Sequence, residues 1–165
     1  MKNTVVLYGT DSGSTGKVAK LIAGKLGGCD VFDVSRFSAS NIEKYENLII
    51  GCPTLGVGEL QDDWDVFLPE MKSQNLSGKT IAIFGLGDSD CYNDSFVDAI
   101  GILYNELKDS GASIVGEVET AGYNFSGSTG VIDGKFVGLP IDEDNESEKT
   151  EERIIDWIEN IGSSL

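Results

Sequence analysis

The sequence predicts a doubly wound α/β fold, in which a parallel sheet is covered by helices on both faces. Three observations predict it: apolar runs of strand length, helical periodicity between these runs, and a chain of 165 residues. This length suits one domain, expected to span residues 1–165. Strands that alternate with helices favour right-handed crossovers and hence parallel pairing.

Five short runs rich in apolar and β-branched residues are the expected strands. Apolar residues follow one another in them without alternation, which is typical of strands buried on both faces. The runs cover residues 4–8, 31–34, 48–51, 80–84 and 113–116.

The segments between these runs repeat an apolar residue every three or four positions, which predicts amphipathic helices. Gly27 follows the first of them as a C-terminal cap, and Thr150 is expected to cap the N-terminus of the last. The expected helices cover residues 14–26, 62–71, 95–107 and 150–161, with a short helix over 38–45.

Residues 120–134 interrupt this alternation. The segment is rich in Gly, Ser and Thr, and a strand-like run at 136–141 follows it. We expect an insertion that interrupts or extends the fifth strand.

The charge balance excludes several classes of function. The chain has 28 acidic and 12 basic residues, a formal net charge of −16 and no histidine. A field of this sign opposes binding to nucleic acid and to anionic membranes. Without histidine, a Ser-His-Asp triad, a Cys-His dyad and a histidine-ligated zinc site are impossible.

The three cysteines, Cys29, Cys52 and Cys91, are widely spaced and form no CxxC motif. This pattern indicates neither a disulfide framework nor a metal site. It suits the reducing cytoplasm. The apolar run near the N-terminus, residues 4–8, is too short for a signal peptide or a membrane span.

Acidic residues gather in two segments, 59–65 and 88–98, each of which has four acids and no base. One interpretation is a solvated acidic surface that aids solubility. The other is that both segments flank one site and steer a basic partner toward it.

The loop after the first expected strand has the composition of an anion-binding site. Residues 10–16 read TDSGSTG, and their hydroxyl groups precede a helix whose first N–H groups lack partners within the helix. Such neutral donors suit a phosphate monoester that is held without being hydrolysed. The Walker pattern fails, because Asp11 stands at its first glycine and Val18 at its Ser/Thr position. An ordinary capped turn is the structural alternative.

Two further loops, 52–61 and 86–92, follow the third and fourth expected strands. Their glycines allow a backbone to approach a ligand closely, and Tyr92 offers a flat face for stacking. Ligands of open α/β sheets bind at the carboxyl ends of the strands, where all three loops are expected. Together they predict a phosphate grip beside a slot for a planar ring.

With these motifs the sequence resembles flavodoxins of the long-chain type along essentially its whole length. The loops carry the resemblance in TxSGxT at 10–15, CPTLGVGELQDDW at 52–64 and GLGDSDCY at 85–92. The insertion and the acidic segment after it carry it in TAGYNF at 120–125 and KFVGLPIDEDNE at 135–146.

The resemblance implies a flavodoxin-like sheet of five parallel strands in the order 2-1-3-4-5. It implies a low-potential electron carrier, not an enzyme, that binds FMN non-covalently and passes between quinone, semiquinone and hydroquinone states. Its implied partners are redox proteins such as a flavodoxin/ferredoxin-NADP reductase or a pyruvate oxidoreductase, and the implied carrier is a cytoplasmic monomer.

The resemblance also places the cofactor contacts. The ring is expected against Tyr92, with Leu55 on its other side where many members of the family have tryptophan. The Gly56–Val57 peptide stands where the family has a carbonyl that turns toward flavin N5 on reduction. The full set of expected FMN contacts is Thr10, Asp11, Ser12, Gly13, Ser14, Thr15, Pro53, Thr54, Leu55, Gly56, Gly58, Leu86, Gly87, Asp88, Tyr92, Ser95 and Asp144.

FMN is expected rather than FAD, because no GxGxxG fingerprint follows any expected strand. Gly85 and Gly87 continue into Asp88, Ser89 and Asp90, so the third glycine is missing.

Three other functions on related sheets are the alternatives to this one. A phosphorelay receiver needs an aspartate at the end of the third strand, where this chain has Cys52 and Pro53. A low-molecular-weight tyrosine phosphatase needs CxxxxxR, and Cys29 and Arg36 are one residue too far apart. A flavin-dependent quinone or nitro reductase stays open as the alternative function, although the chain has little spare length for a substrate pocket.

Overall fold

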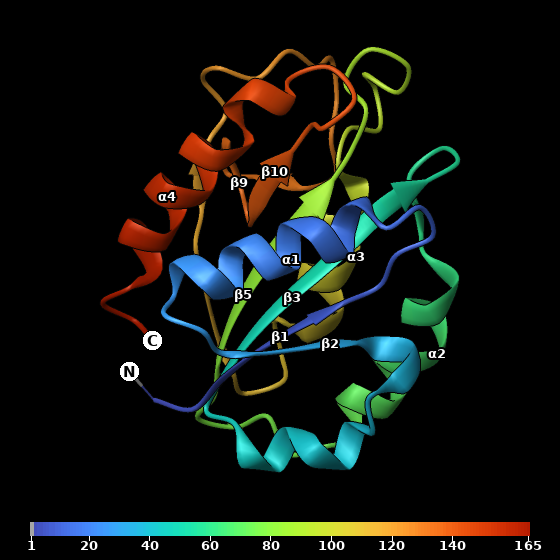
Figure 1. Cartoon of the computed structure of the whole chain (residues 1–165). Helices are drawn as coiled ribbons and strands as arrows, with labels where there is room; N and C mark the ends of the chain where they lie inside the picture. Colours follow the sequence, from blue (N-terminus) through green and yellow to red (C-terminus); the bar gives the residue numbers. More distant parts are fainter. Residues whose placement is uncertain (1) are drawn as a thin grey trace.

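The computed structural model describes residues 2–165 and is organised around a parallel sheet (Figure 1). Its continuous strands lie in the order β2-β1-β3-β5, and two short strands, β6 and β10, pair with successive halves of β5. The predicted order 2-1-3-4-5 and the interrupted fifth strand are therefore confirmed. The strands are β1 (Thr4–Tyr8), β2 (Asp30–Asp33), β3 (Asn47–Leu55), β5 (Thr80–Leu86), β6 (Ser113–Val115) and β10 (Leu139–Ile141).

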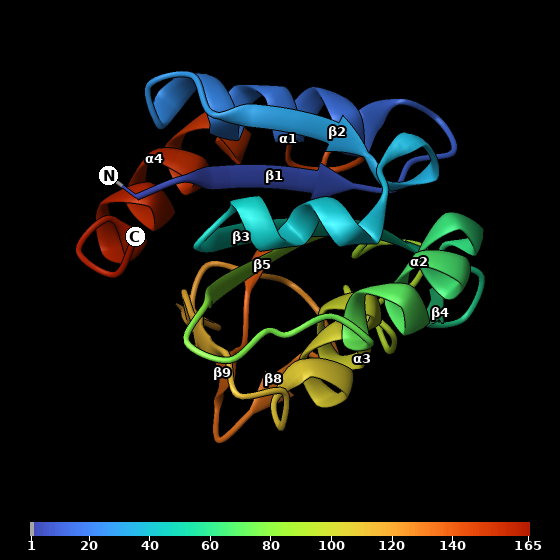
Figure 2. The ribbon, with the colours of Figure 1, turned by 90° about the horizontal axis from the view of Figure 1, so that it is seen from below.

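Helices cover both faces of the sheet, as Figure 2 shows. They are α1 (Ser14–Lys25) and α4 (Thr150–Ile161) on one face, and α2 (Asp62–Lys72) and α3 (Asp98–Leu107) on the other. Alternate residues of β1 serve the two cores: Val6 packs with α1 and α4, whereas Val5 and Leu7 pack with α2 and α3. This double burial explains the continuous apolar run in the sequence.

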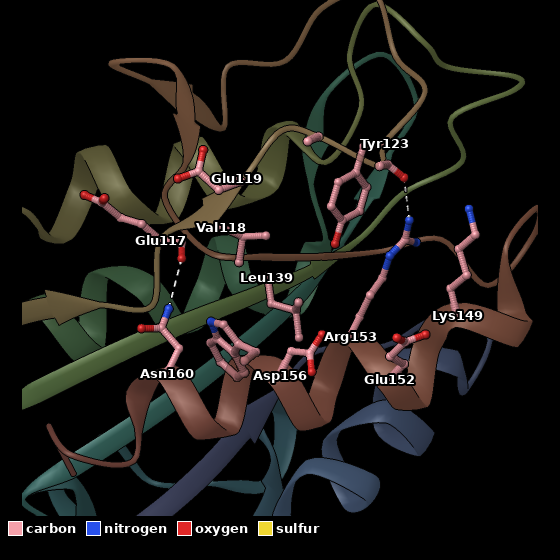
Figure 3. Close-up of a pocket in the computed structure, with 13 residues that line it drawn as sticks. Glu117, Val118, Glu119, Tyr123, Leu139, Lys149, Glu152, Arg153, Asp156 and Asn160 are labelled. Atoms are coloured by element: carbon pink, nitrogen blue, oxygen red, sulfur yellow. Dashed lines mark hydrogen bonds between the residues drawn. The ribbon is translucent and has the colours of Figure 1, made fainter.

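The insertion folds into a small antiparallel sheet in the order β7-β9-β8. Its strands are β7 (Val118–Glu119), β8 (Val131–Ile132) and β9 (Lys135–Phe136). Arg153 fixes the insertion to helix α4: its guanidinium lies 4.0 Å from the Tyr123 ring centroid and donates a 3.0 Å hydrogen bond to Gly122 O (Figure 3). The insertion is thus packed against the body of the fold.

Four smaller elements complete the described chain. A short helix is confirmed within residues 38–45 as a 3₁₀ turn, η2 (Ala39–Lys44), and further 3₁₀ turns are η1 (Val34–Arg36) and η3 (Ser147–Lys149). Strand β4 (Glu59–Leu60) forms a hairpin with the end of β3. Within residues 2–165, no helix combines the length and the apolar character needed to cross a membrane.

Four sequence-based expectations are wrong in detail. β2 is an edge strand rather than doubly buried, and Phe32 is 40% exposed. Helix α3 begins at Asp98 instead of residue 95, because Val97 adopts a left-handed φ of 47° that ends the preceding turn. Thr150 does not cap α4: it lies inside the helix, and its hydroxyl donates to Glu143 Oε2 at 3.1 Å. The run at 136–141 is divided between β9 and β10.

Candidate functional site

A cleft of about 230 Å³ opens at the carboxyl edge of the sheet, where all three predicted loops meet. The loop after β10 joins them there and brings two acidic side chains. Parallel strands end at a common edge, so residues far apart in sequence converge. The lining residues are Ser12, Ser14, Thr15, Pro53, Thr54, Leu55, Leu86, Gly87, Asp88, Tyr92, Glu143 and Asp144.

The loop between β1 and α1 forms the anion-binding side of the cleft. Gly13 has a left-handed φ of 92°, and its N–H donates to Thr10 Oγ1 at 2.9 Å, which turns the chain into α1. In the described part of the chain, no group accepts a hydrogen bond from the backbone N–H of Ser14, Thr15 or Gly16. These donors and the neighbouring hydroxyls are available to an anion at the positive end of the helix.

No lysine or arginine lines this cleft within the described residues. A phosphate bound there would therefore be held by neutral dipoles. The Asp11 carboxylate does not line the cleft; it accepts a 3.1 Å hydrogen bond from Gln61 Nε2. Gln61, which is buried, also donates to Asp63 at 2.7 Å and so joins the phosphate loop to the start of α2.

The hairpin between β3 and β4 supplies Pro53, Thr54 and Leu55 to the cleft. Thr54 Oγ1 accepts the Ala99 N–H at 3.2 Å, which ties this wall to the first turn of α3. The turn that follows contains Gly56 and Gly58, with left-handed φ values of 49° and 78°. Both glycines therefore occupy conformations that an L side chain would strain.

Tyr92 lines the cleft from the loop after β5, and Leu55 lines it from the hairpin. Asp88 shapes the tyrosine loop, because its Oδ1 accepts the N–H groups of Asp90 at 3.2 Å and Cys91 at 3.0 Å. Its carbonyl accepts the Tyr92 N–H at 2.9 Å. The hydrogen bond from the Cys91 backbone, followed by that from Asn145, lowers the pKa of Asp88 below its ordinary value.

The loop after β10 makes one end of the cleft acidic. Glu143 and Asp144 line it, close to Asp88. Partial burial raises the pKa of Asp144, and the negative charges of Asp88, Asp142 and Glu143 raise it further. This end of the cleft therefore disfavours additional negative charge.

Eleven of the seventeen residues expected to contact FMN line the cleft, and six do not. Thr10 and Gly13 stabilise the turn of the phosphate loop through the hydrogen bond between them. Gly58 packs toward α3, where a Cβ would lie 2.4 Å from Asp98 Oδ2. Ser95 is buried beneath the tyrosine loop and donates its N–H to Tyr92 O at 3.3 Å. The six residues outside the lining are Thr10, Asp11, Gly13, Gly56, Gly58 and Ser95.

Sequence reasoning missed Glu143, although it lies within the quoted motif at 135–146. It also missed Gln61 and Asn145, which connect loops without lining the cleft. Their roles depend on partners 50 and 57 residues away, which no local pattern discloses.

A larger cavity of about 530 Å³ lies between the insertion and α4 (Figure 3). Acidic and aromatic side chains line it, including Glu152, Asp156 and Trp157. None of the three predicted loops contributes to it, and its described lining contains neither a hydroxyl-rich turn nor a glycine-rich loop. The chemistry of the smaller cleft, rather than cavity size, identifies it as the candidate site.

Comparison with known proteins agrees with this arrangement of fold and site. The family model described as Flavodoxin matches residues 6–157. The chain is 44% identical to a flavodoxin of Picosynechococcus over 96% of its own length and 95% of the relative. It is 41% identical to Flavodoxin 1 of Escherichia coli, with 100% and 96% covered.

A solved structure gives the same result. The crystal structure of Fusobacterium nucleatum flavodoxin bound to flavin mononucleotide is 32% identical in sequence and superposes with a TM-score of 0.94. The alignment covers 100% of this chain and 99% of that one. A doubly wound sheet with a neutral phosphate loop and a tyrosine-lined slot defines a class of flavin-binding electron carriers. This chain belongs to the flavodoxin family.

Proposed function

We propose that this chain is an electron carrier that binds one FMN non-covalently in the cleft at the carboxyl edge of the sheet. The observation that carries the proposal is the pairing of a neutral phosphate cradle with a slot lined by Tyr92 and Leu55. Membership of the flavodoxin family supports a carrier over an enzyme.

The residues present fit the phosphate group of FMN. The hydroxyls of Ser12, Ser14 and Thr15 and the N–H groups at the start of α1 are donors suited to a phosphate monoester. The absence of a basic side chain from the described lining suits binding without activation of the phosphate. Gly13 and Asp11 contribute indirectly, because their hydrogen bonds with Thr10 and Gln61 hold the loop in shape.

The remaining lining fits an isoalloxazine ring. Tyr92 provides an aromatic face and Leu55 an aliphatic one, while Gly87 permits close approach of the backbone. Leu55 replaces the tryptophan that many family members carry, so Tyr92 is the principal stacking residue. When bound, FMN supplies a ring that accepts and releases electrons one at a time.

Two properties of the chain favour one-electron transfer at low potential. The glycines at 56 and 58 permit the Gly56–Val57 peptide to rotate and present its carbonyl to a proton at the ring. Asp88, Glu143 and Asp144 place negative charge at one end of the cleft, which disfavours a second negative charge on the ring. Both effects separate the uptake of the first electron from that of the second.

An acidic rim is defined here as Glu59 on β4, Asp62, Asp63 and Asp65 in the first turn of α2, and Asp90 and Asp94 in the loop after β5. None of these carboxylates forms an ion pair with the described residues. We propose that the rim receives a basic redox partner, such as a flavodoxin/ferredoxin-NADP reductase or a pyruvate oxidoreductase.

Membership of the flavodoxin family favours the carrier over the alternative, a flavin-dependent quinone or nitro reductase. We propose that residues 1–165 act as one FMN-binding domain and as a monomer. The three cysteines are free, which suits a reducing cytoplasm.

Acid extraction of the purified protein tests the identity of the cofactor. We expect FMN in a one-to-one ratio with the chain, because the cleft offers a grip for one phosphate. Stoichiometric FAD, or no flavin after reconstitution of the apoprotein with FMN, would contradict the proposal. Direct oxidation of NADPH by the purified protein would favour the reductase.

A further inference from the structure

Asp142 is a carboxylate with no exposed surface at the end of β10. Its Oδ2 accepts the Ser89 N–H at 3.2 Å and the Ser89 hydroxyl. Its Oδ1 accepts the Asn145 N–H at 3.1 Å, and the Asn145 side-chain amide donates to both oxygens at 3.0 and 3.1 Å. All of its described partners are neutral, so no cation explains the burial of this charge.

The Asn145 amide extends this network to the tyrosine loop. Its Nδ2 also donates to Asp88 Oδ1 at 2.9 Å. Asp88 in turn accepts the N–H groups of Asp90 and Cys91 on its side chain and that of Tyr92 on its carbonyl. A continuous series of hydrogen bonds therefore leads from Asp142 to Tyr92.

The two segments joined in this way both line the cleft. Asp88 and Tyr92 belong to the loop after β5, whereas Glu143 and Asp144 follow Asp142 directly. Backbone bonding holds β5 and β10 together only as far as Gly87, whose N–H donates to Ile141 O at 3.0 Å. Beyond that point the two loops are joined by Asp142, which accepts from Ser89, and by Asn145, which Asp142 holds and which donates to Asp88.

We propose that Asp142 is a positioning residue for the flavin ring, acting through Ser89 and Asn145 on the placement of Tyr92. The inference rests on the proposed FMN site and deepens it. Asp142 does not line the cleft itself. A carboxylate is required because every group that faces it donates a hydrogen bond, and the amide of asparagine would set a donor against a donor.

The inference separates ring binding from phosphate binding. Asp142 belongs to the loop after β10 and not to the phosphate loop. Its hydrogen bonds run to Ser89 and Asn145, and none of them reaches residues 10–16. Loss of the network should therefore weaken riboflavin, which has no phosphate, by the same factor as FMN. Removal of a negative charge alone would act in the opposite direction on FMN, a dianion, and would leave neutral riboflavin unchanged.

Fluorescence titration of the apoprotein with FMN and with riboflavin tests the inference. The variants are Asp142→Asn, Tyr92→Ala, the double variant and Ser14→Ala, with Asp109→Asn as the charge-matched control on the exposed surface. We expect Asp142→Asn to weaken both ligands by about two- to tenfold, the range expected from aromatic stacking. In the Tyr92→Ala background the same change should have little further effect. Ser14→Ala should weaken FMN and not riboflavin.

Circular dichroism of each apoprotein establishes that it is folded before binding is measured. If Asp142→Asn does not fold, Asn145→Ala replaces it, since Asn145 is exposed and its side chain forms the link to Asp88. Unchanged affinities in the folded variant, or equal losses with and without Tyr92, would overturn the inference. Failure of the wild-type protein to bind either flavin would instead overturn the proposed function.

Discussion

Thr10 and Gly13 close the phosphate loop across three residues, with the Gly13 N–H donating to Thr10 Oγ1 at 2.9 Å. The bond holds Gly13 at a φ of 92° immediately before α1. The direction of the unpaired N–H groups of the helix therefore depends on a backbone conformation that glycine adopts without strain.

Gly13→Ala should weaken FMN binding and leave riboflavin binding nearly unchanged. A Cβ at this position meets no atom within 4 Å, so any effect arises from backbone strain of about 1–2 kcal/mol. Gly24→Ala is the matched control, because it also has open space but lies inside α1 with an ordinary φ. We expect Gly24→Ala to leave FMN affinity intact and to stabilise the helix by up to about 1 kcal/mol. Equal FMN affinities for the two variants would argue against the cradle.

Tyr92→Ala should reduce FMN affinity more than Leu55→Ala. Aromatic stacking contributes about 0.5–1.5 kcal/mol beyond the burial of area, and Leu55 offers only the burial. Isothermal titration calorimetry of the two apoproteins measures the difference. If the two losses are equal, or if neither variant loses affinity, Tyr92 is not the principal stacking residue.

The fold could be predicted because its signals are local. The strands β1, β3 and β5 are continuous apolar runs, since helices cover both faces of the sheet. The division of the fifth strand was expected from the composition of residues 120–134. The sequence does not predict how the two parts pair: β6 and β10 both pair with the same strand, β5.

The errors arise from contacts made between distant parts of the chain. The start of α3 is delayed because the Phe96 N–H bonds to Gly127 O in the insertion, which draws residues 95–97 out of the helix. The capping pattern at Thr150 fails because its hydroxyl donates a hydrogen bond to the Glu143 carboxylate and does not accept one from the N–H groups of α4. The side chains that line the site were largely predictable from three loops at one edge, whereas Asp142 and Asn145 act through buried contacts that leave no local pattern.

The pKa of Asp88 should rise toward its ordinary value of 3.8 in Asn145→Ala, because one of the hydrogen bonds to its charged form is lost. The rise should be partial, since the larger contribution comes from the Cys91 N–H. Titration of the Asp88 carboxyl carbon by NMR in the apoprotein measures it.

The sign of the accompanying stability change follows from the lowered pKa. The hydrogen bonds to charged Asp88 stabilise the fold above the ordinary pKa of 3.8, and this contribution is lost as the pH falls through the lower folded pKa. The stability difference between wild type and Asn145→Ala should therefore shrink on acidification through that window. A difference that grows on acidification, or an unchanged pKa, would contradict this assignment.

Electron transfer from a flavodoxin-reducing NADPH reductase to this chain should slow between low and moderate ionic strength. The acidic rim attracts a basic partner over about 10 Å at 0.1 M salt, and added salt screens that attraction. Neutralising Glu59 and Asp62 should reduce the rate and its salt dependence. The double variant Glu148→Gln and Asp109→Asn, which removes two exposed charges outside the rim, serves as the charge-matched control. Stopped-flow rates that are independent of salt would exclude steering by the rim.

Stepwise reductive titration of the FMN-loaded protein, followed by absorption spectroscopy, tests the central claim of a one-electron carrier. We expect a long-wavelength band of the one-electron-reduced flavin to accumulate before full reduction. Gly56→Thr should diminish it, because Gly56 has a φ of 49° while the nearest atom to an added Cβ, the Glu59 carboxyl carbon at 3.4 Å, leaves room for the side chain. Direct passage of the wild-type protein from oxidised to fully reduced flavin, with no radical band, would contradict the account.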